Sequence, residues 1–256
     1  MDFAIPDKIT EDLEQFTGFL RTQMEPFLTE WYKREAVPRE FFQNSGKAGW
    51  LGFTLKNGEL LEQSYLTQTI LLEQLAKISP GVAVAIMVHI SLGMVPIYLF
   101  GSEKQKKIYL PPALRGETLL CLGNTEHKAG SDVASVAMRA EKAEGGWLLN
   151  GTKAYVTNGA ISDLALVTAV SDPDASRNRR LSMFLVDLSL TGVSRKKLNK
   201  RVWIPSDLTR LSFNNVFVPE ENLVGEQGRG LQQVLATFTQ SRIPISGLTL
   251  GTAVGA

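Results

Sequence analysis

The chain has 256 residues, of which 44% are apolar, and this is enough to bury one large hydrophobic core or two modest ones. Lysine and arginine number 27 against 26 aspartate and glutamate residues, so no net field attracts nucleic acid or an anionic bilayer. The densest basic clusters, residues 104–107 and 195–201, are interrupted by neutral residues and are interpreted as solvated faces.

The single cysteine and the first residues of the chain bear on its compartment. Cys121 lies in the apolar segment 119–122, which predicts a buried, inert thiol and a reducing environment. Residues 1–7 have neither a basic segment followed by an apolar one nor an arginine-rich amphipathic presequence. These features predict a cytoplasmic protein.

Apolar residues in the first part of the chain recur at spacings of three and four, as in amphipathic helices. The first pattern is Ile9, Leu13, Phe16, Leu20 and Met24, and the second is Leu61, Tyr65, Thr69, Leu72 and Ala76. We expect the second helix to stop at Ser79-Pro80. Ser102 is typical of an N-cap for a further helix, which we expect to reach about Leu110 and to end at Pro111-Pro112.

No aspartate, glutamate, lysine or arginine occurs between Lys77 and Glu103, and this stretch is long enough to span a membrane. Prolines and glycines divide it, and His89 and Ser91 place polar groups near its centre. In lipid each backbone group freed by a proline would need a protein partner. We therefore expect a buried helix followed by a second, short helix, and no membrane span.

From Thr118 the apolar period changes from about 3.6 residues to 2, which indicates a change from helix to strand and a domain boundary. The predicted strands are residues 119–123, 133–143, 147–149, 152–158, 164–170, 183–188, 193–197 and 209–218. Gly145-Gly146 and Asn150-Gly151 are expected to supply the positive φ angles of tight hairpin turns.

A turn with three glycines, residues 224–230, ends the predicted strands. A helical pattern resumes at Leu231 and continues towards the end of the chain, with Pro244 as a candidate kink. The predicted organisation is a helical domain over residues 1–117, a β domain over 118–229, and the start of a second helical domain over 230–256.

Two polar segments have the composition of a ligand site. Residues 125–132, Thr-Glu-His-Lys-Ala-Gly-Ser-Asp, offer hydroxyl and backbone donors to an anionic or heteroaromatic ligand, or form a polar connection in which Ser131 and Asp132 cap local amides. In residues 153–159, regular alternation places Tyr155 and Thr157 on one side of a strand, where they meet a flat ligand or form an ordinary cross-strand pair. Taken alone, each segment fits the structural role better.

In their order and separation these two segments resemble the acyl-CoA dehydrogenase family. That family has a Thr-Glu-Pro-Gly-Ala-Gly-Ser-Asp loop and, after an Asn-Gly-x-Lys turn, a Trp-Ile-Thr-Asn-Gly segment. Further similar stretches are residues 91–97, 101–106, 109–111 and 216–226. The resemblance spans nearly the whole chain, and several motifs in order are far more specific than any one of them.

The resemblance implies that the chain binds FAD at the positions that match the family motifs. These are Leu122, Asn124, Thr125, Gly130, Ser131, Tyr155, Val156 and Thr157. It places Thr125 near the flavin ring and the Thr157 hydroxyl as a donor toward flavin N5. Because reduction puts negative charge on the flavin, such donors stabilise the reduced form. Tyr155 stands where the family often has Trp, and either ring can stack on a flavin.

The resemblance also implies contacts with an acyl-CoA thioester. The matching positions are Ser131, Thr239, Gln240, Ser241 and Arg242. In this family a carboxylate removes the α-proton while hydride passes from the β-carbon to the flavin. In some members that base precedes an arginine on this helix, but here Ser241 precedes Arg242. We therefore expect no catalytic base in this chain, a base beyond residue 256, and no metal ligands.

This sequence departs from the family pattern at several positions. His127-Lys128 replaces Pro-Gly and adds positive charge to the flavin loop. Thr239 replaces the aspartate of an Asp-x-x-Arg pattern, and residues 198–201 match a Leu-Gly-x-Arg pattern only loosely. These changes leave the acyl-chain specificity open.

The predicted fold is α+β, with an N-terminal helical domain, a middle β-barrel-like domain and the first helix of a truncated C-terminal helical bundle. The expected function is FAD-dependent α,β-dehydrogenation of an acyl-CoA, with electrons passed to an electron-transfer flavoprotein, in a homo-oligomer (dimer or tetramer) when complete. Two alternatives are an acyl-CoA oxidase that uses oxygen, and a non-catalytic or partial subunit of a flavoprotein complex that binds its partner through exposed apolar surface.

Overall fold

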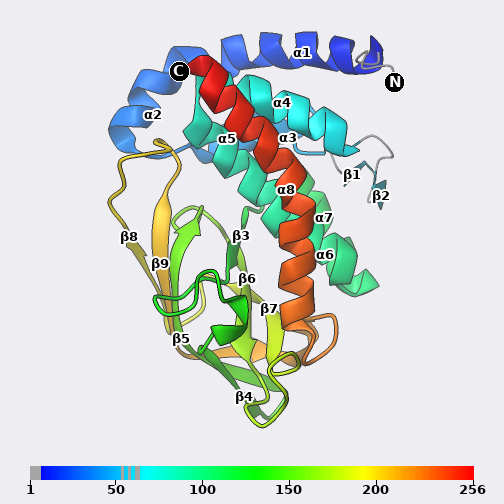
Figure 1. Cartoon of the computed structure of the whole chain (residues 1–256), viewed down its shortest axis with the longest axis vertical. Coiled ribbons are helices and arrows are strands. Elements are labelled where there is room, and N and C mark those ends of the chain that lie inside the picture. The colour runs from blue at the N-terminus through cyan, green and yellow to red at the C-terminus, as the bar shows by residue number, and fades with distance from the viewer. Residues whose placement is uncertain (1–6, 53–54, 57–58, 61–63) are drawn as a thin grey trace.

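A computed structural model describes residues 7–52, 55–56, 59–60 and 64–256 of the protein. Helices from the first part of the chain form the upper layer in Figure 1, and strands from the middle form the lower layer. The last helix runs from the strand layer back across the other helices (Figure 1). Residues 1–6, which contain most of the segment used to predict the compartment, and Leu61 lie outside the described residues.

The helical layer contains the predicted amphipathic helices and several short elements. They are α1 (Asp7–Gln23), η1 (Glu25–Phe27), α2 (Leu28–Arg34), α3 (Arg39–Lys47), the short pair β1 (Leu55–Lys56) and β2 (Glu59–Leu60), α4 (Ser64–Ile78), α5 (Pro80–Met87), η2 (Val88–Met94), α6 (Val95–Phe100) and α7 (Glu103–Leu114). The predicted apolar face of α1 is buried at Ile9, Phe16 and Leu20. The expected stop of α4 is confirmed, because Ser79 instead caps α5 through its side chain.

The long uncharged stretch forms one continuous helical run, Pro80–Phe100, which is apolar and long enough to cross a membrane. Of its most apolar window 83% is buried inside the protein, as in the core helix of a globular protein. The predicted division into two helices is wrong, because the π-helical segment η2 joins α5 to α6. Pro96 lies in the first turn of α6, where a missing N–H is tolerated.

Helix α7 begins as predicted and ends later than predicted. The Ser102 hydroxyl accepts from the Gln105 amide at 3.2 Å, and the Gln105 side chain accepts from the Ser102 amide at 2.9 Å, which completes a capping box. The helix continues through Pro111 and Pro112 to Leu114. A proline has no backbone N–H to donate, but its carbonyl can still accept a hydrogen bond. The Pro111 carbonyl accepts from the Arg115 amide at 3.2 Å. The expected end at Pro111-Pro112 is therefore wrong.

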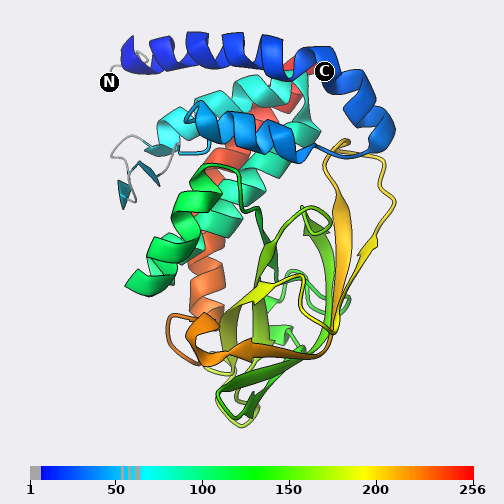
Figure 2. The same cartoon turned by 180° about the vertical axis from the view of Figure 1, so that it is seen from behind.

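The strand layer is an eight-stranded sheet in the order β10-β7-β6-β4-β5-β9-β8, with β3 paired to β6. Its strands are β3 (Leu120–Gly123), β4 (Arg139–Ala143), β5 (Gly146–Thr157), β6 (Leu164–Val170), β7 (Leu181–Asp187), β8 (Val193–Lys197), β9 (Leu208–Pro219) and β10 (Leu223–Val224). The long strands β5 and β9 pair antiparallel, and Figure 2 shows the strand layer from behind. The described pairings leave β10 and β8 as two separate ends, so the structure gives a sheet, and the barrel-like closure stays a prediction.

Two strand predictions fail for identifiable reasons. Residues 133–143 do not form one strand, because Val133–Ser135 is the 3-10 turn η3 and pairing with β5 begins only at Arg139. Asn150-Gly151 is not a hairpin turn but lies inside β5, where the pairing with β9 shifts register. The other expected turn is confirmed, since Gly145, with φ of 73°, joins β4 to β5.

The three-glycine turn ends the sheet as predicted, with η4 (Glu220–Asn222) and β10 before it and α8 (Gly230–Gly255) after it. Helix α8 lies against α4 at positions where only glycine fits. A Cβ on Gly247 would stand 2.2 Å from the Thr69 carbonyl oxygen. Gly251 and Gly255 approach the carbonyl oxygens of Glu73 and Lys77 in the same way, so residue numbers rise together along both helices and α4 and α8 run in the same direction. Pro244 is accommodated inside α8.

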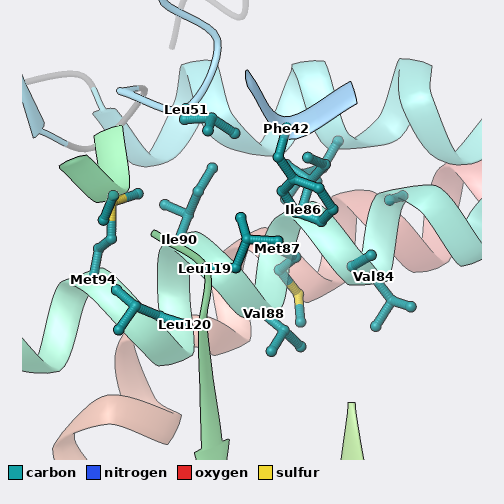
Figure 3. Close-up of a cluster of buried hydrophobic side chains, with 14 of the residues drawn as sticks. Phe42, Leu51, Val84, Ile86, Met87, Val88, Ile90, Met94, Leu119 and Leu120 are labelled. Atoms are coloured by element: carbon teal, nitrogen blue, oxygen red, sulfur yellow. The ribbon is translucent and has the colours of Figure 1, made fainter. Parts of the chain in front are cut away.

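The main core lies where the helices meet the start of the sheet. Figure 3 shows Phe42 and Leu51 facing Ile86 and Ile90, with Leu119 and Leu120 entering from β3 and its preceding residue. A second core lies within the sheet around Trp147 and Phe184. Arg39 joins the two layers through a bidentate contact with Asp163, at 3.1 and 2.8 Å.

Candidate active site

The first part of the candidate site is the loop that leaves β3. Strand β3 lies parallel to β6 and buries Cys121, as its apolar neighbours predict. Beyond it, the buried Asn124 accepts a hydrogen bond from Thr168 at 2.7 Å, while its own side-chain N–H groups have no partner among the described residues. The loop therefore starts from a fixed position in the sheet.

A buried ion pair attaches this loop to β5. The Lys153 ammonium lies 2.7 Å from Glu126 and donates to the Asn124 carbonyl at 3.1 Å, and the lysine side chain is 0% exposed. The Glu126 carboxylate also accepts from the amides of Ala137 and Met138, at 2.9 and 3.0 Å. Both residues lie in the two predicted polar segments, but neither side chain was assigned a role there. The signal that would have found them is a lysine at an inward position of a strand.

Burial and pairing shift both pKa values. Burial lowers the pKa of Lys153 to about 8, and the neighbouring Glu126 carboxylate opposes this shift. For Glu126 burial acts to raise the pKa, but Lys153 and the two backbone amides outweigh it, so the net direction is downward. Both groups are charged at neutral pH, and the pair holds its geometry there.

The second part of the site is the end of β5. Tyr155 has a left-handed backbone with φ of 57°, and the pairing of β5 with β9 is irregular between Lys153 and Val156. The bulge interrupts the regular strand that the alternation assumed, but burial still alternates from Ala154 to Asn158, with Tyr155 and Thr157 the more exposed residues. The Tyr155 ring is 56% exposed, and its edge-to-face partner is His127 at 6.0 Å. The loop and the strand end thus lie side by side.

Residues after Thr157 are held firmly by distant groups. Asn158 donates to the Ala85 carbonyl at 2.7 Å, which ties the strand end to α5. The Ala160 amide donates to Asp207 at 3.0 Å, and Arg195 donates to the carbonyls of Ala160 and Ser162 at 3.1 and 2.9 Å. Arg195 was placed on a solvated face; it is exposed and also fixes this turn. The position of Thr157 is therefore well determined.

Three hydroxyl groups remain available at this junction. Within the described chain, the side chains of Thr125, Ser131 and Thr157 make no hydrogen bond. Thr125 and Thr157 are half-buried, and Ser131 is exposed. A Cβ added to Gly130 would meet nothing within 4 Å, so the backbone is open to an incoming group. Leu122 and Val156 pack in the two cores, and the Val156 carbonyl accepts from the Gly159 amide at 3.3 Å.

The predicted substrate residues on α8 lie in a different environment. Thr239 and Ser241 donate to the carbonyls of Leu235 and Phe238 in their own helix, at 2.9 and 3.0 Å. Gln240 accepts a hydrogen bond from Tyr65 of α4, and Arg242 is exposed. No hydrogen bond or ion pair of the described residues joins these four to the 122–131 segment. The Thr125 carbonyl accepts from the amide of Ala154, the residue before Tyr155, at 2.8 Å, whereas the role of the four α8 residues stays a prediction.

A cavity of about 390 Å³ lies elsewhere, among α1, α2 and α3. Phe27, Trp31 and Phe41 line it together with Gln23 and Asn44, and no residue predicted for the site does. Within residues 7–52, 55–56, 59–60 and 64–256, no group of three or more His, Cys, Asp or Glu side chains is placed to hold a metal ion. The chemistry of the candidate site therefore depends on hydroxyl, amide and aromatic groups.

Comparison with known proteins identifies the family. The model of the acyl-CoA dehydrogenase N-terminal domain matches residues 10–117, and that of the middle domain matches residues 121–216. An acyl-CoA dehydrogenase from Bacillus subtilis (strain 168) is 32% identical over 240 residues, which cover 93% of this chain and 63% of the relative.

Solved structures share the fold over the full length of the chain. The acyl-CoA dehydrogenase from Geobacillus kaustophilus matches with a TM-score of 0.94 and 28% identity, covering 100% of this chain and 68% of that chain. A chain in a structure described as the electron transferring flavoprotein of Acidaminococcus fermentans matches with a TM-score of 0.92 and 28% identity, covering 100% of this chain and 67% of that one. The protein thus spans about two thirds of the length of these relatives. Since two domain models in the expected order and the shared fold agree, the chain belongs to the acyl-CoA dehydrogenase family.

Proposed function

We propose that the protein is the FAD-binding and substrate-facing part of an acyl-CoA dehydrogenase. The single observation that carries this proposal is the junction of the β3 loop with the end of β5. The hydroxyls of Thr125, Ser131 and Thr157 have no partner within the described chain, and the exposed Tyr155 packs its ring against His127 of the same loop. Neutral donors next to an aromatic face suit a flat heteroaromatic group that gains negative charge on reduction.

The residues present fit FAD in chemistry. The cofactor, when bound, accepts a hydride and passes on electrons. Thr125 and Thr157 would hold its ring through their hydroxyls, Tyr155 would stack on it, and Gly130 and Ser131 would offer open backbone and a hydroxyl to the same ligand. The half-burial of Thr125 and Thr157 excludes part of the water that would otherwise compete for these donors.

The chain's own residues do not supply the base for proton abstraction. Ser241 precedes the exposed Arg242 on α8, and a hydroxyl without an adjacent base does not remove an α-proton at neutral pH. In our proposal a carboxylate outside these residues performs that step, and the protein passes its electrons to an electron-transfer flavoprotein as part of a homo-oligomer. The similarity to a chain in an electron transferring flavoprotein structure supports this partner.

The test uses protein expressed from the full coding sequence and incubated with FAD. We expect a yellow protein whose flavin absorbance bleaches anaerobically when a series of acyl-CoA thioesters is added. Turnover with a dye acceptor but not with oxygen distinguishes a dehydrogenase from an oxidase. A colourless protein, or a flavin that no acyl-CoA reduces, would overturn the proposal.

One observation favours a second candidate, a non-catalytic subunit of a flavoprotein complex. Helix α8 exposes Leu235, Ile243, Leu250 and Val254, which are between 47% and 61% exposed and follow helical spacing along one side. Such a stripe is typical of a face that another polypeptide covers. This candidate predicts FAD uptake only after a partner subunit is added, and no bleaching by acyl-CoA.

A further inference from the structure

Strand β5 carries a buried charged group, the ammonium of Lys153. Lys153 is 0% exposed and is among the largest fully buried side chains of the described residues. Removing an ammonium from water costs several kcal/mol, and an apolar residue of similar volume often gives equal or greater stability. A lysine at this position is therefore better explained by what it holds than by fold stability.

The contacts of Lys153 converge on one loop. The ammonium donates to the Asn124 carbonyl at 3.1 Å and pairs with Glu126 at 2.7 Å, while the next amide along β5, that of Ala154, donates to the Thr125 carbonyl at 2.8 Å. Three successive loop residues are thus attached to two successive residues of β5. Thr125 is one of the attached loop residues, and Thr157 lies shortly after Ala154 in β5.

The same carboxylate closes the far end of the loop. Glu126 accepts from the amides of Ala137 and Met138, just before β4 begins. Residues 127–136, which include Gly130 and Ser131, are therefore held as one closed segment with the Lys153–Glu126 pair at its base. Only 12% of the Glu126 side chain is exposed, so water competes little for these contacts.

The sheet itself does not set this register. Strand β3 pairs with β6, whereas β5 pairs with β4 and β9. No ladder of backbone hydrogen bonds joins β3 to β5, and the bulge at Tyr155 further separates the strand end from regular pairing. The spacing between the loop and the end of β5 depends on the bonds of Lys153, Glu126 and Ala154. Gly123 and Lys153 are also closely packed, since a Cβ on Gly123 would stand 3.3 Å from the lysine Cγ.

We propose that Lys153 is a positioning residue, which pins the 124–138 loop to β5 and so fixes the donors of Thr125 and Ser131 relative to Thr157. The role toward flavin rests on the proposed FAD function, whereas the pinning of the loop does not. Glu126 is its ion-pair partner. The Glu126 carboxylate binds Lys153 at the start of the loop and the amides of Ala137 and Met138 at its end.

The experiment compares three variants with a matched control. Lys153→Met removes the buried ammonium, Glu126→Gln removes the carboxylate charge and keeps an acceptor for only one of the two amides, and the double variant removes both charges. Lys104→Met is the control, because Lys104 pairs with Glu221 at 2.6 Å while both side chains are more than half exposed. Amide hydrogen exchange, urea unfolding and FAD titration are measured for each.

We expect Lys153→Met to speed exchange in peptides covering residues 124–138 at least tenfold, and to weaken FAD binding at least tenfold, while peptides from β6 and β7 change less than twofold. The double variant should regain most of the unfolding midpoint, since no unpaired charge remains buried, but not the loop protection or the FAD affinity. The control should match the wild type. If Lys153→Met does not fold, Glu126→Gln provides the same comparison with smaller effects.

Each other result has a defined meaning. Faster exchange spread evenly over 124–138 and 164–187 would show a general stability role and overturn the proposal, as would recovery of loop protection in the double variant. If the Lys153→Met variant binds FAD with the same affinity as the wild type, the role toward flavin is overturned. A wild type that binds no FAD would overturn the proposed function, and hydrogen exchange alone would then decide whether Lys153 pins the loop.

Discussion

A Cβ added to Gly251 of α8 would stand 2.1 Å from the carbonyl oxygen of Glu73 in α4. The equivalent distance from Gly255 to the Lys77 carbonyl oxygen is 2.3 Å, so the close contact repeats every four residues along both helices. Real side-chain atoms do not approach a backbone oxygen this closely. The two helices are therefore packed backbone to backbone.

Gly251→Ala is expected to destabilise the protein although alanine favours helix. The new methyl group must push α8 away from α4, and overpacking of this kind costs about 1–3 kcal/mol. Urea unfolding measures the change. Gly18→Ala in α1 is the matched control, because a Cβ there meets nothing within 4 Å and alanine should add roughly 0.5–1 kcal/mol. A stabilising effect of Gly251→Ala would show that the helices are not in backbone contact.

The pH dependence of stability should contain a contribution from His89. Its Nδ1 accepts from the Leu120 amide at 3.2 Å and its Nε2 lies 3.0 Å from the Ala113 carbonyl, which fixes the neutral tautomer with the proton on Nε2. Burial lowers the pKa of His89 from 6.5 to about 4; the Ala113 carbonyl and Asp163 oppose this shift, and Arg39 adds to it. The native state therefore binds fewer protons than the unfolded state between these two values.

By linkage, the stability due to neutral His89 is fully present above pH 6.5 and is lost as the pH falls towards about 4. The loss should be about 2–3 kcal/mol between pH 7 and pH 4.5. A glutamine side chain can accept from the Leu120 amide and donate to the Ala113 carbonyl, and it does not titrate. The free energy of unfolding of His89→Gln, measured with urea, should therefore change less between these two pH values. Parallel profiles for both proteins would contradict the assignment.

Cys121 should not react with thiol reagents in the native protein. Burial raises the pKa of its thiol to about 12, and the side chain is fully enclosed, so both the thiolate and access to it are missing. We expect negligible labelling at pH 8 in native buffer and complete labelling in denaturant. A Glu144→Cys, Cys121→Ala protein, with its thiol in the exposed β4–β5 turn, should label in both conditions. Rapid native labelling of Cys121 would indicate local opening of β3.

Thr157→Ala should affect flavin reduction more than folding. The hydroxyl has no partner within the described chain, so its loss should change the free energy of unfolding by less than about 0.5 kcal/mol. If it donates to the reduced flavin, the same change should remove about 1.5–3 kcal/mol of stabilisation from that form. Thr152→Ala is the control in the same strand, because its hydroxyl is bonded to Ser212 at 3.3 Å. Equal losses in reduction and folding would support a purely structural role for Thr157.

Much of the fold could be predicted because it depends on neighbours in the sequence. The apolar spacing of Ile9, Phe16 and Leu20 determines one face of α1, and the Ser102 capping box forms within four residues. Strands 164–170 and 193–197 have the predicted bounds for the same reason. The sequence likewise contained the motif residues from which the family resemblance was drawn.

Tertiary contacts decided the features that the sequence did not. Asn150-Gly151 stays within β5 because β9 continues to pair on both sides of it. The Lys153–Glu126 pair joins residues 27 positions apart, so the strand pattern could indicate an inward-facing lysine but not its partner. The candidate site combines both kinds of information: the sequence by itself determined which hydroxyls and which aromatic residue are present, and only the folded chain decided their relative positions, because the strands that carry them are not paired with each other.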